Sequence, residues 1–197
     1  MYTTKNKFAT IIFIVKNMAL IILGHPDIEK SLANKTIIEK LKNSSLDIEI
    51  RNLSRLYPDF NINIKDEQEA LLKHQTIIFQ YPLYWYNMPA ILKHWFDLVF
   101  EYQFSYGSQG DKLKGKHFIP SFTVGAPESE YHTLGEHHFK VYEFCKNMEQ
   151  TAYYAQMKYV DPIYFHGTSV NAGYTKEDIE RKASGQAERL IQLLSEY

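Results

Sequence analysis

The chain alternates short apolar runs with amphipathic helical patterns, and this alternation constrains the fold more than any other feature. Five strands are predicted, over residues 19–23, 46–50, 76–80, 117–123 and 159–165. Helical spacing predicts the intervening helices, over residues 31–41 and 65–73, from Pro89 onward, over 138–154 and from Thr175 onward. Strands that alternate with helices form a parallel sheet covered on both faces. At 197 residues an open, doubly wound α/β sheet is expected, because a closed barrel of eight such units typically takes ~250 residues.

The strand order expected for such a sheet, 2-1-3-4-5, predicts where a ligand binds. Ligands of open α/β sheets bind at the carboxyl ends of the strands, where the strand order reverses. In this order the reversal lies between the first and third strands. The loops that meet there are residues 24–31, 80–89 and 123–137, which are the most distinctive loops in the chain.

Charge and cysteine content exclude several classes of protein. The 22 Lys and Arg residues nearly balance the 23 Asp and Glu residues, so a basic nucleic-acid-binding surface is not expected. Cys145 is the only cysteine, which excludes an internal disulfide and a thiolate metal cluster and favours a reducing cytoplasm. The helical pattern around Cys145 favours a buried hydrophobic side chain over a nucleophile.

Residues 1–17 are predicted to be an extension ahead of a single domain over residues 18–197. Two lysines precede the apolar run Phe8–Val15, as in a secretory leader, but the run is short and no small-residue cleavage site follows. No stretch approaches the ~20 apolar residues of a transmembrane helix. Alternatively, this apolar run packs on a neighbouring protein or touches a membrane surface.

The loop after the third predicted strand is rich in aromatic residues. Leu83, Tyr84, Trp85 and Tyr86 lie at its tip, and a helix is predicted to begin near Pro89. Such a tip offers a flat wall and free backbone amides, which suit a planar ring with polar edges such as a flavin. The same side chains would equally suit a packed core beside a tight turn.

The loop after the first strand has the features of a phosphate site. The N-terminus of the following helix presents free N–H groups and a partial positive charge, and Ser31 and His25 add hydrogen-bonding side chains. Neither a G-x-G-x-x-G nor a G-x-x-x-x-G-K-[ST] motif is present, which argues against a dinucleotide fingerprint and a P-loop. Ser31 would also serve as an ordinary helix cap, with His25 a solvated loop residue.

The loop after the fourth strand contains Gly125, where the backbone can approach a ligand closely. Tyr131 and His137 follow it and could stabilise negative charge on a reduced flavin. The neighbouring His132 and His138 raise the possibility of a metal site. No metal is predicted, because the spacing of these histidines does not give a convincing ligand set.

Three motifs together resemble one family. They are Gly24-His-Pro with Ser31-Leu-Ala-Asn34, Pro82-Leu-Tyr-Trp-Tyr with Met88-Pro-Ala-Ile-Leu-Lys93, and Thr123-Val-Gly-Ala-Pro-Glu-Ser-Glu-Tyr131. Over residues 18–168 the chain resembles the flavodoxin-like NAD(P)H:quinone oxidoreductases. Within that family it is most similar to the short bacterial branch, which includes the ancillary oxidoreductases of glutathione-gated potassium efflux.

The resemblance implies a flavodoxin-like fold and a homodimer with flavin at the subunit interface. The flavin is FMN in the short bacterial members and FAD in the longer animal ones. It also implies a ping-pong reaction, in which NAD(P)H and then a quinone use the same pocket. The main alternative is a regulatory flavoprotein that docks on a membrane potassium-efflux transporter, peripheral to the inner face of the membrane, with turnover secondary. A one-electron shuttle is disfavoured because the charge balance is not strongly acidic, and azo or nitro reduction would be the same chemistry on another acceptor.

The resemblance also assigns residues by position. The flavin phosphate is expected to contact His25, Ser31, Leu32 and Ala33. The ring is expected to lie against Pro82, Leu83, Tyr84 and Trp85. Its polar edge is expected to meet Thr123, Val124, Gly125 and Ala126. The catalytic proton-relay pair corresponds to Tyr131 and His137. The walls of the substrate pocket correspond to Tyr86, Phe104 and Tyr106.

Two positions depart from the family pattern. The family usually has Thr-Thr-Gly-Gly where this chain has Thr123-Val-Gly-Ala126, so one hydroxyl contact is absent and Ala126 adds a methyl group at the close approach. His94 stands where a glycine is common and adds bulk to one face of its helix.

Overall fold

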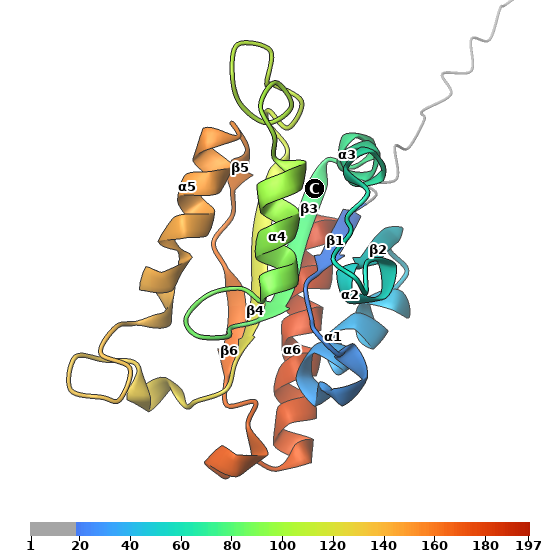
Figure 1. The fold of residues 1–197 in the computed structure, drawn as a ribbon. Helices are drawn as coiled ribbons and strands as arrows, with labels where there is room; N and C mark the ends of the chain where they lie inside the picture. The colour runs from blue at the N-terminus through green and yellow to red at the C-terminus, as the bar shows by residue number, and fades with distance from the viewer. Residues whose placement is uncertain (1–18) are drawn as a thin grey trace, which may run out of the picture.

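The computed structural model describes residues 19–197, so the extension predicted for residues 1–17 lies outside them. A parallel sheet runs through the molecule in the order β2-β1-β3-β4-β5, and β6 also pairs with β4 (Figure 1). The predicted flavodoxin-like α/β fold and strand order are confirmed. The strands are β1 (Ala19–Leu23), β2 (Ile48–Asn52), β3 (Thr76–Pro82), β4 (His117–Val124), β5 (Lys158–Tyr159) and β6 (Ile163–His166).

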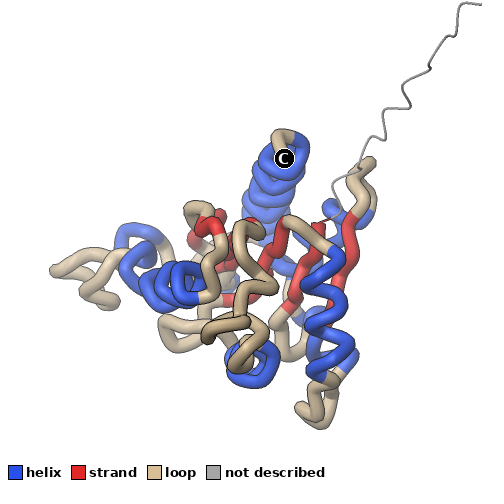
Figure 2. The backbone as a smooth tube through the Cα atoms, turned by 90° about the horizontal axis from the view of Figure 1, so that it is seen from above, coloured by secondary structure: helices blue, strands red, loops and turns tan. Residues whose placement is uncertain are grey.

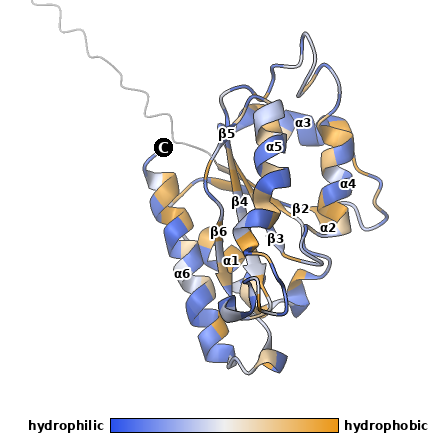
Figure 3. Ribbon diagram, turned by 90° about the vertical axis from the view of Figure 1, so that its left-hand side faces the viewer, coloured by the Kyte–Doolittle hydropathy of each residue, from blue (hydrophilic) through white to orange (hydrophobic). Residues whose placement is uncertain are grey.

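Helices cover both faces of the sheet (Figures 1 and 2). They are α1 (Leu32–Lys42), α2 (Leu53–Leu56), α3 (Ile64–Lys73), α4 (Ala90–Val99), α5 (Lys146–Tyr154) and α6 (Lys176–Ser195). Because side chains alternate along a strand, Ile21 of β1 packs towards α1 and α6, while Leu20 and Ile22 pack towards α2, α3, α4 and α5. Figure 3 shows the apolar strands between helices whose outer faces are hydrophilic. Burial on both faces explains the continuous apolar run of β1.

The fifth predicted strand is interrupted. Lys158–Tyr159 pairs with the start of β4, Ile163–His166 pairs with its end, and the chain leaves the sheet between them. Pro162 lies in this interruption and has no N–H to donate to a neighbouring strand. The re-entry as β6 places His166 beside Val124, at the carboxyl edge of the sheet.

Two predicted helices have different limits in the structure. The helix after Pro89 ends at Val99, so Tyr102, which continues its apolar spacing, lies in a loop and is exposed. The helix predicted from residue 138 begins later, as a 3₁₀ turn at Val141–Cys145 that continues into α5. His138 has φ of 51°, which is incompatible with a right-handed helix. Residues 131–140 therefore form a loop at the carboxyl edge of the sheet.

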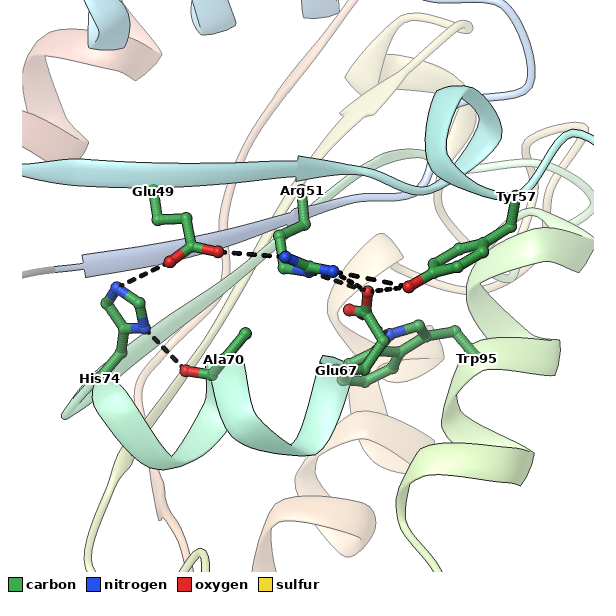
Figure 4. A network of polar contacts seen from close by, with 7 residues as sticks. All are labelled: Glu49, Arg51, Tyr57, Glu67, Ala70, His74 and Trp95. Carbon is green, nitrogen blue, oxygen red and sulfur yellow. Dashed lines mark hydrogen bonds and ion pairs between the residues drawn. The ribbon is translucent and has the colours of Figure 1, made fainter. Parts of the chain in front are cut away.

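A buried ionic network joins β2, α2, α3 and α4 (Figure 4). The Glu67 side chain is fully buried and accepts hydrogen bonds from the Arg51 guanidinium at 2.6 Å and the Tyr57 hydroxyl at 2.5 Å. The Trp95 indole donates to its other oxygen at 2.9 Å. Burial alone would lower the pKa of Arg51, but the hydrogen bond and charge of Glu67 outweigh it and raise that pKa. Burial, followed by the bond to Glu67, raises the pKa of Tyr57 to about 12.

Candidate functional site

A cavity of about 440 Å³ lies at the carboxyl ends of β1, β3 and β4. Its size is within the usual range of small-molecule sites. The four predicted phosphate contacts and three of the predicted ring or edge contacts line it, together with residues from the loop after β6. These residues include His25, Ser31, Leu32, Ala33, Pro82, Tyr84, Thr123 and Thr168. The cavity thus lies at the edge of the sheet where the reversal of strand order predicts a ligand.

Ser31 is the N-cap of α1 and also lines the cavity. Its Oγ accepts hydrogen bonds from the backbone N–H of Asn34 at 3.2 Å and from the Asn34 side-chain amide at 3.1 Å. A hydroxyl has two acceptor lone pairs and one donor hydrogen, so its O–H remains to donate. The helix cap and a ligand contact are therefore compatible roles.

His25 is buried beside the same cavity. Its Nδ1 accepts the backbone N–H of Asp27 at 3.0 Å, which places the proton of the neutral ring on Nε2. Burial lowers the pKa of His25, although the nearby Asp27 charge partly opposes this effect. His25 thus offers a neutral N–H donor, and Ser31 adds an O–H donor.

The aromatic tip after β3 is a tight turn. The Tyr84 and Asn87 backbones exchange two hydrogen bonds, of 2.8 and 3.0 Å. Trp85 and Tyr86 between them have φ of 49° and 63°, a conformation that costs energy for bulky residues and recurs at functional sites. The Trp85 side chain is 92% exposed. The alternative interpretation of these side chains as part of a packed core is therefore wrong for Trp85. Leu83, in contrast, is partly buried against the core.

Backbone rather than side chains faces outward in the loop after β4. A Cβ atom placed on Gly125 would meet no protein atom within 4 Å, so the backbone there borders open space. Val124 is fully buried, and its side chain packs into the core. Ala126 is half-buried, and its carbonyl accepts the Gly167 N–H at 3.3 Å. Thr123 lines the cavity, whereas Val124, Gly125 and Ala126 are not among its lining residues.

An aromatic and histidine cluster lies on the neighbouring loops. The Tyr131 and His137 rings stack with centroids 4.2 Å apart, and the Tyr86 hydroxyl lies 3.2 Å from His137 Nδ1. His137 Nε2 is buried and has no hydrogen-bond partner among the described residues. Burial, with a smaller effect of Tyr86, raises the pKa of Tyr131. Neither Tyr131 nor His137 is among the residues that line the cavity.

His166 belongs to the same cluster, although its sequence position did not single it out. Its ring lies 5.1 Å from that of Tyr131, centroid to centroid, and its buried Nδ1 has no partner within residues 19–197. Burial lowers the pKa of His166, while the neighbouring Ala126 backbone and the charge of Glu128 oppose that effect. Its place at the carboxyl end of the fifth predicted strand was the signal that could have found it.

Two predicted pocket residues lie elsewhere in the chain. The loop that carries Phe104 and Tyr106 follows the C-terminus of α4, whereas the aromatic turn precedes its N-terminus, and Figure 1 shows these loops at opposite ends of the sheet. Phe104 is buried in the core of its own chain, and the ring of Tyr106 lies 5.3 Å from that of Tyr154. Within one chain, neither residue shares the cavity with Ser31.

The described residues contain neither a candidate metal site nor a candidate membrane span. In residues 19–197, no three His, Cys, Asp or Glu side chains come together in a way that could hold a metal ion. No helix in this part of the chain is long and apolar enough to cross a membrane. A larger cavity, of about 650 Å³, lies on the other side of the 24–31 loop, between α1 and β2. Acidic and basic side chains line it in equal number. The charge of its lining therefore favours neither an anionic nor a cationic ligand.

Fold and site together define a flavodoxin-like α/β protein with a cavity at the edge of the sheet where the strand order reverses. The chain belongs to the family described as having the flavodoxin-like fold, whose model matches residues 17–190. It is 38% identical over 175 residues to an uncharacterised NAD(P)H oxidoreductase of Bacillus subtilis, YrkL, an alignment that covers 89% of this chain and 96% of that protein.

Solved structures of similar proteins share the fold of this chain. General stress protein 14 of Treponema denticola, solved in complex with FMN, has a TM-score of 0.81 and 31% identity, covering 89% of this chain and 99% of that one. An NADPH-quinone reductase of P. pentosaceus has a TM-score of 0.74 and 25% identity, covering 87% and 96%. The names and ligand of these relatives agree with the family, enzyme class and flavin cofactor that the sequence predicts.

Proposed function

We propose that this protein is an FMN-dependent NAD(P)H:quinone oxidoreductase with a ping-pong mechanism. The observation that carries the proposal is the cavity where the strand order reverses, which His25 and Ser31 line together with Tyr84 of the aromatic turn. In this reaction NAD(P)H is oxidised by loss of a hydride. The quinone takes up that hydride together with a proton and becomes a hydroquinone. The oxidised nicotinamide, NAD(P)⁺, leaves the cavity before the quinone enters.

The residues of the chain have separate tasks in this proposal. The hydride-transfer chemistry is that of bound FMN, while the protein binds, orients and shields it. Ser31 and His25 hold the phosphate through their O–H and N–H donors, and the backbone around Gly125 accommodates the polar edge of the ring. Tyr131 and His137 donate hydrogen bonds to the charge that develops during hydride transfer.

The first test is reconstitution. Purified protein is titrated with FMN, and the bound flavin is followed by its absorbance and fluorescence. NADH and NADPH are then compared as donors under anaerobic conditions, with a soluble quinone as acceptor. We expect FMN to bind, to be bleached by a nicotinamide donor and to recover its colour when the quinone is added. Protein that binds neither FMN nor FAD would contradict the proposal.

Substitution of the stacked Tyr and His pair is expected to slow flavin reduction. Tyr131→Phe and His137→Ala should each reduce its rate about tenfold or more, because each removes stabilisation of charge developing in the transition state. Stopped-flow absorbance measures the rate. His138→Ala is the matched control, because this neighbouring histidine is exposed and its Nδ1 contacts only a backbone carbonyl at 3.2 Å. Wild-type reduction rates in both test variants would remove the pair from the mechanism.

A homodimer would complete the site. Tyr106 cannot share the cavity of its own chain, so its predicted role as a pocket wall requires the loop of a second copy. We expect two copies per particle by sedimentation velocity. We also expect Tyr106→Ala to raise the KM for the quinone about three- to tenfold, the range of one lost aromatic contact, with less effect on FMN binding. A monomer with full turnover would contradict this arrangement.

The alternative of a regulatory subunit gains no support from residues 19–197. The apolar run Phe8–Val15, on which membrane or transporter docking would depend, lies outside them. An oxidoreductase therefore remains the function proposed.

A further inference from the structure

A chain of buried polar side chains extends from the proposed phosphate site across the sheet to α6. Its members are Asn34, Gln80, Ser121 and Gln186, each at most 2% exposed. They come from α1, β3, β4 and α6, so no local sequence motif contains them. Polar groups this deeply buried lower stability unless each is hydrogen-bonded. Within residues 19–197 every polar side-chain atom of the four is hydrogen-bonded except Gln186 Oε1, which is buried without a partner. Such a network indicates a task beyond packing.

At one end of this hydrogen-bonded network, the orientation of the Gln186 side-chain amide is fixed. The Gln186 Nε2 group donates to the Ile163 backbone carbonyl at 3.2 Å and to Ser121 Oγ at 2.8 Å. A carbonyl oxygen can only accept, so the Gln186 amide nitrogen must face β6. Ser121 Oγ accepts this bond, and its single O–H hydrogen donates to Gln80 Oε1 at 2.6 Å.

The orientation of the Gln186 amide in turn determines the orientation of the Asn34 amide, which lies at the cavity. Because Gln80 Oε1 is the acceptor, Gln80 Nε2 donates to Asn34 Oδ1 at 2.8 Å. The Asn34 amide nitrogen must then face the other way, where its two hydrogens go to Ser31 Oγ at 3.1 Å and Thr123 Oγ1 at 3.0 Å. Both hydroxyl oxygens accept from Asn34, and both line the cavity. Their O–H hydrogens are left as donors for a ligand.

We propose that Gln186, Ser121, Gln80 and Asn34 are positioning residues that turn the Ser31 and Thr123 hydroxyls into donors and so make the site select a phosphate-bearing flavin. This inference rests on the proposed function. Reversing the relay would make Asn34 present its carbonyl oxygen, which would accept both O–H groups and leave the phosphate without them. The orientation is therefore set at α6, four hydrogen bonds away from Ser31.

The test compares FMN with riboflavin, which has the same ring and lacks the phosphate. Gln186→Met removes the amide that sets the direction while nearly keeping the side-chain volume. We expect the FMN dissociation constant to rise about tenfold, as for loss of one hydrogen bond to a charged group, and that of riboflavin to change less than twofold. Gln192→Met is the matched control on the same helix, where the side chain is exposed and outside the relay. It should change neither constant.

Ser121→Ala is a second variant, which breaks the relay at its centre with little change in volume. It should weaken FMN binding selectively, as Gln186→Met does. It replaces Gln186→Met in the test if that variant lacks a cooperative unfolding transition and is therefore not folded. Equal losses for FMN and riboflavin, or no loss of FMN affinity, in folded variants would overturn the relay and leave the proposed function standing. Wild-type protein that binds neither flavin would overturn both.

Discussion

Replacing Glu67 by Leu is expected to lower the free energy of unfolding by about 3–5 kcal/mol, the cost of removing one partner from a buried ion pair. The substitution leaves the Arg51 guanidinium, which is largely buried, without its main counter-charge. It also leaves the Tyr57 hydroxyl and the Trp95 indole N–H without their acceptor. Each unsatisfied buried donor costs ~1–3 kcal/mol by itself, so the expected loss is mainly one of desolvation.

Urea unfolding followed by tryptophan fluorescence measures this loss. Glu188→Leu is the matched control, because Glu188 pairs with Lys40 on the surface and should contribute less than about 1 kcal/mol. Arg51→Met combined with Glu67→Leu should recover part of the stability, since the pair would then be replaced by apolar groups of similar size. If Glu67→Leu cost no more than Glu188→Leu, the network would not contribute to stability.

Much of the fold could be predicted because its strongest signals are local. The continuous apolar run of β1 and the periodicity of α6 directly reflect the burial of those segments. The interruption before Ile163 and the late start of α5 were missed, since they depend on one proline and on a positive φ at His138. Apolar periodicity does not report either feature.

The candidate site shows the same limit. The loop residues Ser31 and Gly125 could be placed because parallel strands end at one edge of the sheet. Gln186 could not, because its role depends on contacts between segments more than sixty residues apart. Glu67 was missed for a related reason: a charged residue in an amphipathic helix is usually solvated, and only the fold brings Arg51 and Trp95 to it.

The second large effect is expected on cofactor binding, from Ser31→Asp. Asp is as good an N-cap as Ser, so the start of α1 should be preserved, with the carboxylate accepting the Asn34 N–H as the hydroxyl does. The same carboxylate would place a negative charge in the cavity where the phosphate is proposed to bind. Two unit charges ~4 Å apart repel by about 4 kcal/mol at the effective dielectric near a protein surface.

Allowing for screening by salt, Ser31→Asp should raise the FMN dissociation constant at least about 100-fold. The riboflavin dissociation constant should rise less than about threefold. Fluorescence titration with the two flavins separates the charge effect from damage to the ring site. Ser31→Asn is the neutral control with the same capping ability, and it should weaken FMN about tenfold or less. An FMN affinity in Ser31→Asp within tenfold of the wild type would mean that the phosphate does not bind at the start of α1. The ring would then have to be placed elsewhere along the carboxyl edge of the sheet.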